Sequence, residues 1–520
     1  MPAPDTFRSS RYLKWFLLVT VACAILVSGF NALVDPLGLS PIGLNIPGFN
    51  TLKPLRAQHD RVIKPYDVWR MRPRTIFIGA STVKQSIDPA QLESAGFRPA
   101  YNGGMDNGAD FEEIRRFVRY YIEADPQLKF LRIEVFLPGL AIWARAHDPQ
   151  PPITDTASQV VKDGIAALFS ASAIGFSVET IFQNKIRKPQ PAVSVRSGFS
   201  PVPSSDSHIS VWNLPDMLYR NSVLRPGLSA NPQLFRTAED IIQECRAHKI
   251  DCQFFFSPLH ADALYGIYFM GLWNEICELK KGFARLAPTY DFTRYNDLID
   301  ERAGAVVYWP EGFHFSPALG SKLARVMTGQ RSPDLPLNFG VLMDANTVNA
   351  DVAVWTAERD AWIRRHPLIA ARYEAARFNV SEAVPRRGRL DSASRSIDIS
   401  GELYTVRKGA AGVVEWSSPE AALALGWVGD VEKGRPALAV AVFADGDLIA
   451  YAKPNYPRPE LAKDPRDPLG IGGFLIPVGS GKRGATENWR AFALFEDKIA
   501  VELIYAVAAG GFVRADASKK

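Results

Sequence analysis

The first hydrophobic feature of the chain is one long apolar run near its N-terminus. Trp15–Val34 contains about 20 residues without a charge, enough for a helix to cross a hydrocarbon core of ~30 Å. Three basic residues stand in segment 1–14, and this positive flank predicts a cytoplasmic tail and an exported remainder. A cleaved signal peptide is the alternative, but the run continues past the poor cleavage site at Ser28-Gly29. We therefore predict an uncleaved, single-pass anchor over 15–34.

Between Arg72 and about Asp300, short apolar runs alternate with segments of helical periodicity. The predicted strands are Thr75–Ile78, Leu131–Leu137, Cys252–Phe256 and Thr289–Phe292. The predicted helices are Phe111–Glu123, Gln233–His248 and Asp262–Leu286. Alternating strand–helix units of this kind predict an α/β domain in which helices cover both faces of a parallel sheet.

We place this α/β domain at 35–380, with two further segments inside it. Residues 140–230 are rich in Pro, Ser and Gly and are predicted to form an insertion over the sheet. Within them, Ile165–Phe182 is apolar but interrupted by Ser and Glu, which is typical of an amphipathic helix of the soluble part. Ala353–Arg377 is charged and helical, with a kink expected at Pro367.

The pattern changes after about Val384. A basic, polar linker over 381–395 is followed at 396–510 by short alternating runs with turn residues between them, and then by a tail at 511–520. The strand-like runs are Leu403–Val406, Gly412–Trp416, Ala437–Phe443, Asp447–Ala452, Gly472–Pro477, Ala491–Phe495 and Lys498–Leu503. Asp445-Gly446 is a hairpin turn signal between two of them. Regular short strands over this length predict an antiparallel β-sandwich domain.

Composition narrows the class of protein. The chain has 520 residues, of which 47% are hydrophobic and 22% charged, values near the globular average. This excludes a disordered chain, a collagen-like repeat and a polytopic membrane protein. Lys and Arg number 60 against 55 Asp and Glu, for a net charge of +5. There is no basic cluster with interleaved aromatic residues, so no nucleic-acid partner is expected.

Four cysteines are too few for a disulfide framework, and none forms a Cys-x-x-Cys pair of the zinc-binding kind. Cys245 and Cys252 stand at a predicted helix end and in the strand that follows. They are either two buried thiols or one disulfide, and a disulfide would require an oxidising compartment.

Polar residues follow several of the predicted strands, where ligands of open α/β sheets bind. Ser81 comes directly after the first strand and is expected to open a helix, which would expose its hydroxyl and offer N–H groups to an oxyanion. The loop Tyr101–Gly108 contains paired glycines that allow close approach of the backbone to a ligand. In Trp309–Pro317, Glu311 and His314 are three residues apart, so the carboxylate can orient the imidazole towards a serine.

Each of these signals also has a simpler explanation. A serine after a strand is more often a helix cap than a nucleophile, and a lone Glu-x-x-His is a weak motif. Further substrate-site candidates at strand ends or in the same loops are His260, Glu134, Asp291 and Trp309. No metal-binding spacing joins the histidines, and neither a metal nor another cofactor is expected.

Three dispersed blocks resemble those of the SGNH/GDSL hydrolases, namely Gly79-Ala80-Ser81, Asn102-Gly103-Gly104 and Glu311-x-x-His314. The chain is also similar, over roughly residues 30–375, to membrane-anchored bacterial proteins of unassigned role. The blocks that carry this likeness are Ser81, Ile87-Asp88-Pro89, Tyr101-Asn102, Ser257-Pro258-Leu259-His260 and Trp309–His314. At the level of fold, the chain resembles SGNH-like acetyltransferases that modify exopolysaccharides. It departs from the SGNH pattern at Ala80 and Glu311, where the family has Asp, and the family's Asn block is not recognisable.

The resemblance implies a flavodoxin-like sheet and a serine triad. Ser81 would be the nucleophile, His314 the general base and Glu311 the residue that orients the imidazole. The oxyanion donors would be the N–H groups of Ser81 and Gly104, with a side chain of Asn107 or Asn102.

The resemblance also implies a function, acyl transfer on cell-surface polysaccharide by an O-acetyltransferase or esterase. The enzyme would be held in the bacterial inner membrane by one helix, with its catalytic domain in the periplasm. Its partners would be a carbohydrate polymer or acyl-sugar and a membrane acyl-donor protein. The alternative, favoured by Ala80, is a catalytically degenerate scaffold that binds polysaccharide or assembles an export complex. The C-terminal domain resembles β-sandwich modules found beside carbohydrate-active domains.

Overall fold

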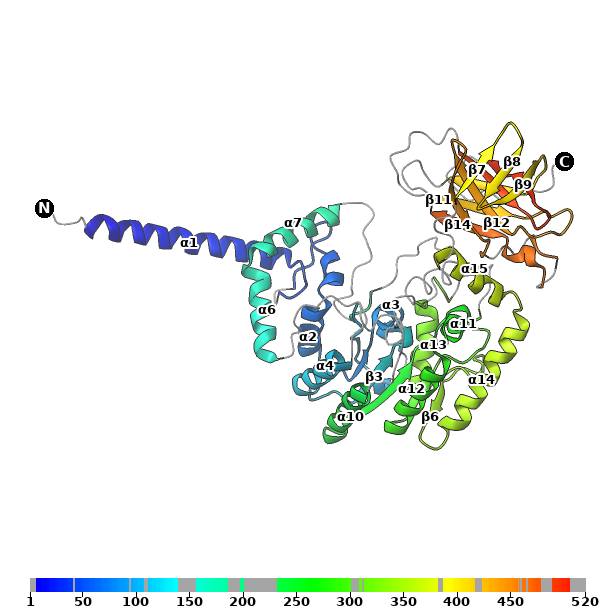
Figure 1. Cartoon of the computed structure of the whole chain (residues 1–520). Coiled ribbons are helices and arrows are strands. Elements are labelled where there is room, and N and C mark those ends of the chain that lie inside the picture. Colours follow the sequence, from blue (N-terminus) through cyan, green and yellow to red (C-terminus); the bar gives the residue numbers. More distant parts are fainter. Residues whose placement is uncertain are drawn as a thin grey trace. The chain divides into compact units, whose positions relative to one another are not determined.

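The computed structural model describes most of the chain, in two compact units (Figure 1). The described residues are 6–40, 43–92, 95–106, 111–138, 156–185, 197–200, 232–300, 308–310, 313–381, 387–416, 423–456, 458, 461–463, 466–477 and 489–505. Of these, 261–273 and 356–505 belong to the second unit and the others to the first. The predicted 140–230 insertion is described only at 156–185 and 197–200, and the tail at 511–520 lies outside the described residues.

The N-terminal apolar run forms one long helix, as predicted. Helix α1 spans Thr6–Val34, and within it Tyr12–Val34 provides 23 residues that are long and apolar enough to cross a membrane. Its side chains from Tyr12 to Leu26 are exposed, whereas Asn31 and Val34 are buried in the first unit.

The first unit is built on a six-stranded sheet in the order β2-β1-β3-β4-β5-β6. Its strands are β1 (Thr75–Ile78), β2 (Ala100–Asn102), β3 (Phe130–Val135), β4 (Asp251–Phe256), β5 (Thr289–Asp291) and β6 (Val341–Met343). All neighbours pair in parallel except β6, which runs antiparallel to β5. The predicted parallel α/β sheet is therefore confirmed, and the order of its first five strands is that of flavodoxin-like proteins. Strands β2 and β6 were not predicted; each is three residues long and gains its strand geometry from pairing with β1 or β5.

The helices of the first unit and of the segment that follows it agree with the predicted pattern in most places. Their bounds are α2 (Asp60–Met71), α3 (Ser81–Ser86), α4 (Phe111–Ala124), α6 (Ala157–Phe169), α7 (Ala171–Lys185), α10 (Pro232–Ala247), α11 (Ala261–Phe269), α12 (Trp273–Leu286), α13 (Pro317–Met327), α14 (Val348–Arg365) and α15 (Ile369–Ser381). Three segments that were predicted as single helices each form two consecutive helices. They divide at Ser170, at 270–272 and at 366–368, and the last break contains Pro367, which cannot continue the hydrogen-bond ladder of a helix.

Cys245 and Cys252 form a disulfide between the end of α10 and the start of β4, with their Cα atoms 6.1 Å apart. This settles the two alternatives left open by the sequence. Disulfides persist in oxidising compartments and are rare in the cytosol.

We expect Cys245→Ser to lower the free energy of unfolding of the first unit by about 2–3 kcal/mol, because the bond closes a short loop and so restricts the unfolded chain. Denaturant titration of the full-length protein measures this change. Cys23→Ser, which alters a free, exposed thiol, is the control. Equal midpoints for the two variants would contradict the prediction.

The second unit contains the predicted β-rich domain, but its architecture differs from a simple sandwich. Strands β12, β13, β7, β8, β9, β16 and β15 close into a barrel, and β14, β11, β10 and β17 form a separate four-stranded sheet. Their bounds are β7 (Gly388–Asp391), β8 (Ser396–Ile399), β9 (Glu402–Arg407), β10 (Gly412–Trp416), β11 (Leu423–Val428), β12 (Ala439–Ala444), β13 (Asp447–Ala452), β14 (Gly473–Pro477), β15 (Trp489–Leu494), β16 (Ile499–Glu502) and β17 (Ile504–Tyr505).

Strand β12 explains why the two sheets stay together, since all six of its residues are buried. Ala441 and Phe443 belong to the core inside the barrel, whereas Val440 and Val442 belong to a second core shared with the four-stranded sheet. Alternation along one strand therefore supplies two cores. The domain also begins earlier than predicted, because β7 lies within the segment 381–395 that was expected to be a linker.

Candidate active site

Ser81 lies at the turn where β1 passes into α3, at the carboxyl end of the sheet. The four residues of β1 are buried, Ala80 is extended (φ −80°, ψ −165°), and Ser81 is the first residue of the helix. Ser81 is partly exposed, whereas Thr82 and Val83 behind it are buried. Ser81 therefore stands at the edge between the buried strand and the helix, and it opens that helix as the sequence predicts.

A buried carboxylate on the neighbouring strand β3 holds this turn by hydrogen bonds. Glu134, on β3, accepts a hydrogen bond from the Ala80 backbone N–H (2.7 Å) and one from the Thr82 hydroxyl (2.5 Å). Burial raises the pKa of Glu134 above its usual range, and these donors oppose the rise. Glu134, predicted as a substrate-site candidate, thus holds the residues on both sides of Ser81 in place.

The glycine loop after β2 lies against the same turn. The N–H groups of Gly103 and Met105 donate to Phe77 O (2.7 Å) and Gly79 O (2.9 Å), which continues the parallel pairing beyond the end of β1. A Cβ on Gly104 would lie 2.4 Å from the Lys84 backbone nitrogen. Glycine is required here because the loop and α3 are in direct backbone contact.

Two of the predicted oxyanion donors already have partners. The Gly104 N–H donates to Asn102 Oδ1 (2.9 Å), and Asn102 Nδ2 donates to Val83 O (2.7 Å) and Ile87 O (2.6 Å). Asn102 therefore caps the carbonyl end of α3 instead of facing a ligand. Asn107 lies outside the described residues. Of the predicted donors described here, the Ser81 N–H is the one that can point towards a developing oxyanion, because the first N–H groups of a helix have no acceptor within it.

His314 reaches Ser81 from a loop that is anchored by aromatic side chains. Trp309, Phe313 and Phe315 are buried, and Trp309 Nε1 donates to Leu298 O (2.8 Å). His314, between the two buried phenylalanines, is partly exposed. Its Nε2 lies 2.8 Å from Ser81 Oγ. The structure thus joins two residues that are 233 positions apart in the chain.

The helix after this loop packs on the helix that carries Ser81. Gly320, in α13, lies so close to α3 that a Cβ on it would be 1.8 Å from Ser86 O, and the Ser86 hydroxyl donates to Phe315 O. These two contacts fix the distance between the start of α13 and α3. A larger residue at position 320 would push His314 away from Ser81.

The electrostatics of the pair favour a neutral imidazole. Burial lowers the pKa of His314 to about 4, and the negative charge of Asp106 opposes this shift. A neutral ring can accept the proton of the serine hydroxyl, which a general base must do.

This pKa predicts an unusual pH profile. We expect kcat/KM for ester hydrolysis to stay level from neutral pH down to about 5 and to fall tenfold per pH unit below about 4, because the imidazole becomes protonated there. An ordinary histidine would be half protonated near pH ~6.5. Hydrolysis of an activated acetyl ester between pH 3.5 and 8 measures the profile, with circular dichroism at each pH to show that the fold persists. A half-point at pH 6 or above would contradict the prediction.

The remaining candidates have structural partners. The His260 ring meets the Trp309 ring edge-on, with centroids 5.6 Å apart, so both support the loop of His314. Lys280 Nζ donates to Asp291 Oδ2 (2.7 Å). Burial raises the pKa of Asp291, but Lys280 and Thr293 outweigh this and hold it below its usual range. Glu311 lies outside the described residues, and its predicted role stays a prediction.

Sequence reasoning missed a buried ionic cluster beside the serine. Lys84, on α3, donates to Asp60 Oδ2 (2.7 Å) and Asp106 Oδ2 (2.6 Å). Lys84 and Asp60 are almost fully buried, and Asp106 is partly exposed. The cluster ties α3 to α2 and to the glycine loop. In the sequence, Lys84 stands three residues after Ser81. Because lysine is normally a surface residue, its sequence position did not indicate a buried cluster.

Among the residues that the structure describes, no group of three or more His, Cys, Asp or Glu side chains is placed to hold a metal ion. No protein-family model matches the chain, and no curated protein matches it in sequence. The class of protein is therefore inferred from the fold and the site. It is an α/β protein of flavodoxin-like strand order with a serine–histidine pair at the carboxyl end of β1, an N-terminal apolar helix and a C-terminal β-barrel domain.

Proposed function

We propose that this protein is a membrane-anchored, periplasmic acyl-transfer enzyme of the SGNH type, an O-acetyltransferase or esterase that acts on cell-surface polysaccharide. The observation that carries the proposal is the 2.8 Å contact between His314 Nε2 and Ser81 Oγ. Its position supports the proposal as well, because ligands of open α/β sheets bind at the carboxyl ends of strands beside the point where strand order reverses. That point lies between β1 and β3; Ser81 opens the helix that follows β1, and Glu134 is on β3.

In the proposed reaction, Ser81 Oγ attacks the acyl carbonyl while His314 Nε2 takes the serine proton. The oxyanion that forms is bound by the Ser81 N–H. Collapse of the intermediate breaks the bond to the leaving oxygen, which receives the proton from His314. Water or a sugar hydroxyl then gives a proton to His314 and attacks the acyl-serine, and His314 returns that proton to Ser81 Oγ. Glu311 orients the imidazole and stabilises the imidazolium.

Two observations support the proposed location. Helix α1 has the length and hydropathy of a membrane span, and a basic flank before it favours a cytoplasmic N-terminus. The Cys245–Cys252 disulfide fits the oxidising periplasm on the other side.

One observation favours the second candidate function, a catalytically degenerate scaffold that binds polysaccharide or assembles an export complex. Two groups predicted as oxyanion donors already have acceptors. The Gly104 N–H donates to Asn102 Oδ1, and Asn102 Nδ2 donates to a backbone carbonyl of α3. Loss of one such donor costs ~10²–10³ in rate. An experiment must therefore distinguish an enzyme of low activity from a protein that only binds.

Labelling with a fluorophosphonate probe separates them, because the probe phosphonylates a serine only where a base activates it. We expect one modified peptide containing Ser81 in the full-length protein, and none in Ser81→Ala. Ser158→Ala, at an exposed serine of α6, is the matched control and should label like the wild type. Absence of labelling in the folded wild type would favour the scaffold.

A further inference from the structure

Helices α6 and α7 carry two rows of large apolar side chains that face outwards. On α6, Val161, Ile165 and Phe169 are 58, 53 and 58% exposed. On α7, Val178 and Phe182 are 56 and 59% exposed. Within each row the residues are four positions apart, so they share one face of their helix.

Ile174 extends the α7 row by one turn and is 37% exposed. Charged residues of both signs stand on the two helices: Lys162 and Lys185 are exposed, and Asp163 and Glu179 are partly exposed. An apolar face on a helix that also carries charged residues is typical of helices that lie on a lipid surface.

The opposite faces of these helices are fixed to the rest of the unit, so the outward rows form a defined surface. Val160, Ala173 and Thr180 are buried. The Ser177 hydroxyl donates to Asn31 Oδ1 of α1 (2.9 Å). Asn184 exchanges two hydrogen bonds with the backbone of Leu52, both 2.9 Å long.

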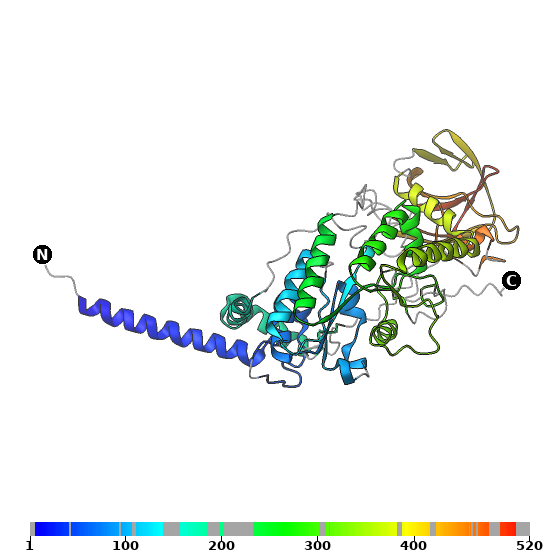
Figure 2. The ribbon, with the colours of Figure 1, turned by 90° about the horizontal axis from the view of Figure 1, so that it is seen from below.

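The position of α1 relates these rows to the membrane. Figure 1 shows α1 projecting from the unit with α6 and α7 beside its end, and Figure 2 shows α6 nearly along its own axis while α1 lies across the view. Helix α6 therefore runs across α1. If α1 crosses the bilayer, α6 is placed along its surface.

The length of α1 decides how deep this surface lies. The uncharged part of α1 begins at Trp15, after Lys14, and its exposed stretch Trp15–Leu26 is about 12 residues and so ~18 Å long. A hydrocarbon core of ~30 Å needs about 20 residues. The bilayer must therefore extend to the last turns of α1, which are the turns that α6 and α7 contact.

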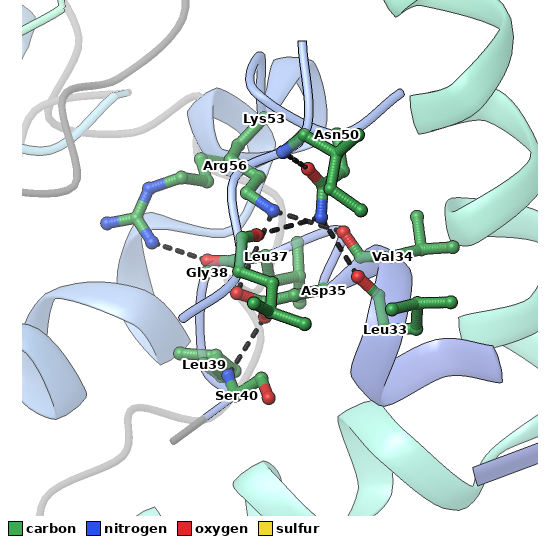
Figure 3. A network of polar contacts seen from close by, with 12 residues as sticks. Leu33, Val34, Asp35, Leu37, Gly38, Leu39, Ser40, Asn50, Lys53 and Arg56 are labelled. Atoms are coloured by element: carbon green, nitrogen blue, oxygen red, sulfur yellow. Dashed lines mark hydrogen bonds and ion pairs between the residues drawn. The ribbon is translucent and has the colours of Figure 1, made fainter. Parts of the chain in front are cut away.

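The polar groups at the end of α1 are satisfied internally, as this depth requires. Figure 3 shows the network: Asn50 Nδ2 donates to Leu33 O (2.9 Å), and Lys53 Nζ donates to Val34 O (3.0 Å). Lys53 Nζ also lies 3.7 Å from Asp35 Oδ2. A cation at a helix C-terminus is stabilised by the helix dipole.

Three exposed apolar side chains surround this sealed end. Leu33, Leu44 and Ile46 are 41 to 44% exposed, and Asn50 bonds to the backbone of each of them. We call these three side chains and the rows of α6 and α7 together the apolar collar.

We propose that the apolar collar is a membrane-surface site that inserts into the boundary between headgroups and acyl chains around α1. Its partner is the phospholipid bilayer itself. This inference rests on the proposed anchoring of α1. Its consequence is that the α/β unit is held against the bilayer at a fixed height and orientation, and does not move freely on a tether.

Fluorescence quenching by brominated lipids tests the collar in the full-length protein. In a Cys23→Ser background, Val161→Cys and Val178→Cys carry an environment-sensitive fluorophore, and the protein is reconstituted into phosphatidylcholine–phosphatidylglycerol vesicles. Leu17→Cys, in the exposed part of α1, reports the anchor. Glu239→Cys, at an exposed position of α10, is the matched control on another helix of the same unit.

We expect Val161→Cys and Val178→Cys to be quenched most by lipids brominated near the carbonyl end. Leu17→Cys lies near the opposite boundary of the span that begins at Trp15, and it should be quenched by the same lipids. Glu239→Cys should not be quenched. Quenching at Leu17→Cys without quenching at the two collar positions would overturn the inference and leave the anchor intact. Collar labels that are shielded from water but not quenched by lipid would also overturn it, because a second protein copy would then cover the rows. No quenching at Leu17→Cys would overturn the anchor itself.

Discussion

His314→Ala should reduce the hydrolysis of an activated acetyl ester at pH 7.5 by ~10⁴-fold or more, which is the size of effect seen when the base of a serine triad is removed. The reason is that, among the described residues, His314 is the base in contact with the Ser81 hydroxyl that can take its proton. His314 Nε2 lies 2.8 Å from Ser81 Oγ, and without it the hydroxyl must react at its ordinary, very weak nucleophilicity.

The measurement compares initial rates of wild type, His314→Ala and Ser81→Ala in the full-length protein. His248→Ala removes an exposed imidazole at the end of α10 and should leave the rate within twofold of wild type. Removal of the histidine also leaves a space beside Phe313 and Phe315, so His314→Gln serves as a second, better-filled variant. A rate for both variants close to wild type would refute the serine–histidine mechanism.

Glu311→Gln is the prediction with the second largest effect. The change is nearly isosteric, so the fold should persist, but it removes the charge that stabilises the imidazolium and can reverse the tautomer of His314. In a serine triad such a loss reaches ~10⁴ in kcat, whereas a carboxylate that only faces solvent would give almost no change. The rate of ester hydrolysis with Ser81→Ala as the blank measures it.

The structure also names the residue to test if Glu311→Gln has no effect. Asp106 is the described acid whose charge raises the pKa of His314, whereas Asp291 is bound to Lys280 and Glu134 to the serine turn. Asp106→Asn in the Glu311→Gln background would then lower the rate if Asp106 supports the base. Rates unchanged in both variants would leave His314 acting as half of a dyad.

Much of the fold follows from local sequence. Strand β1 and helix α4 were predicted within one residue, because a short β-branched run and a strong helical periodicity survive in any tertiary context. Strand β10 was predicted from its alternation, and β13 from its alternation together with the Asp445-Gly446 turn before it. Strands β2 and β6 were missed because their short segments become strands by pairing with β1 and β5 at the two edges of the sheet.

The features of the site, too, are partly local in the sequence and partly set by tertiary contacts. Ser81 and His314 were found because each follows an apolar anchor in the chain, and local sequence shows such anchors. The roles of Glu134 and Asn102 depend on which backbone groups come to lie beside them, and this is set by β1, β3 and α3 meeting at one edge of the sheet. Both were predicted to face a ligand, and both instead support the turn.

The long apolar N-terminal helix, the alternation of strands and helices, and the residue types that can carry acyl-transfer chemistry follow from the sequence, since these depend on composition and on periods of a few residues. The tertiary structure alone decided the contact between Ser81 and His314, the Cys245–Cys252 bond, the closure of the C-terminal strands into a barrel and the outward direction of the apolar rows on α6 and α7. The physical reason is that each of these is a relation between distant segments. Its energy depends on how the segments pack, and no short stretch of sequence contains that information.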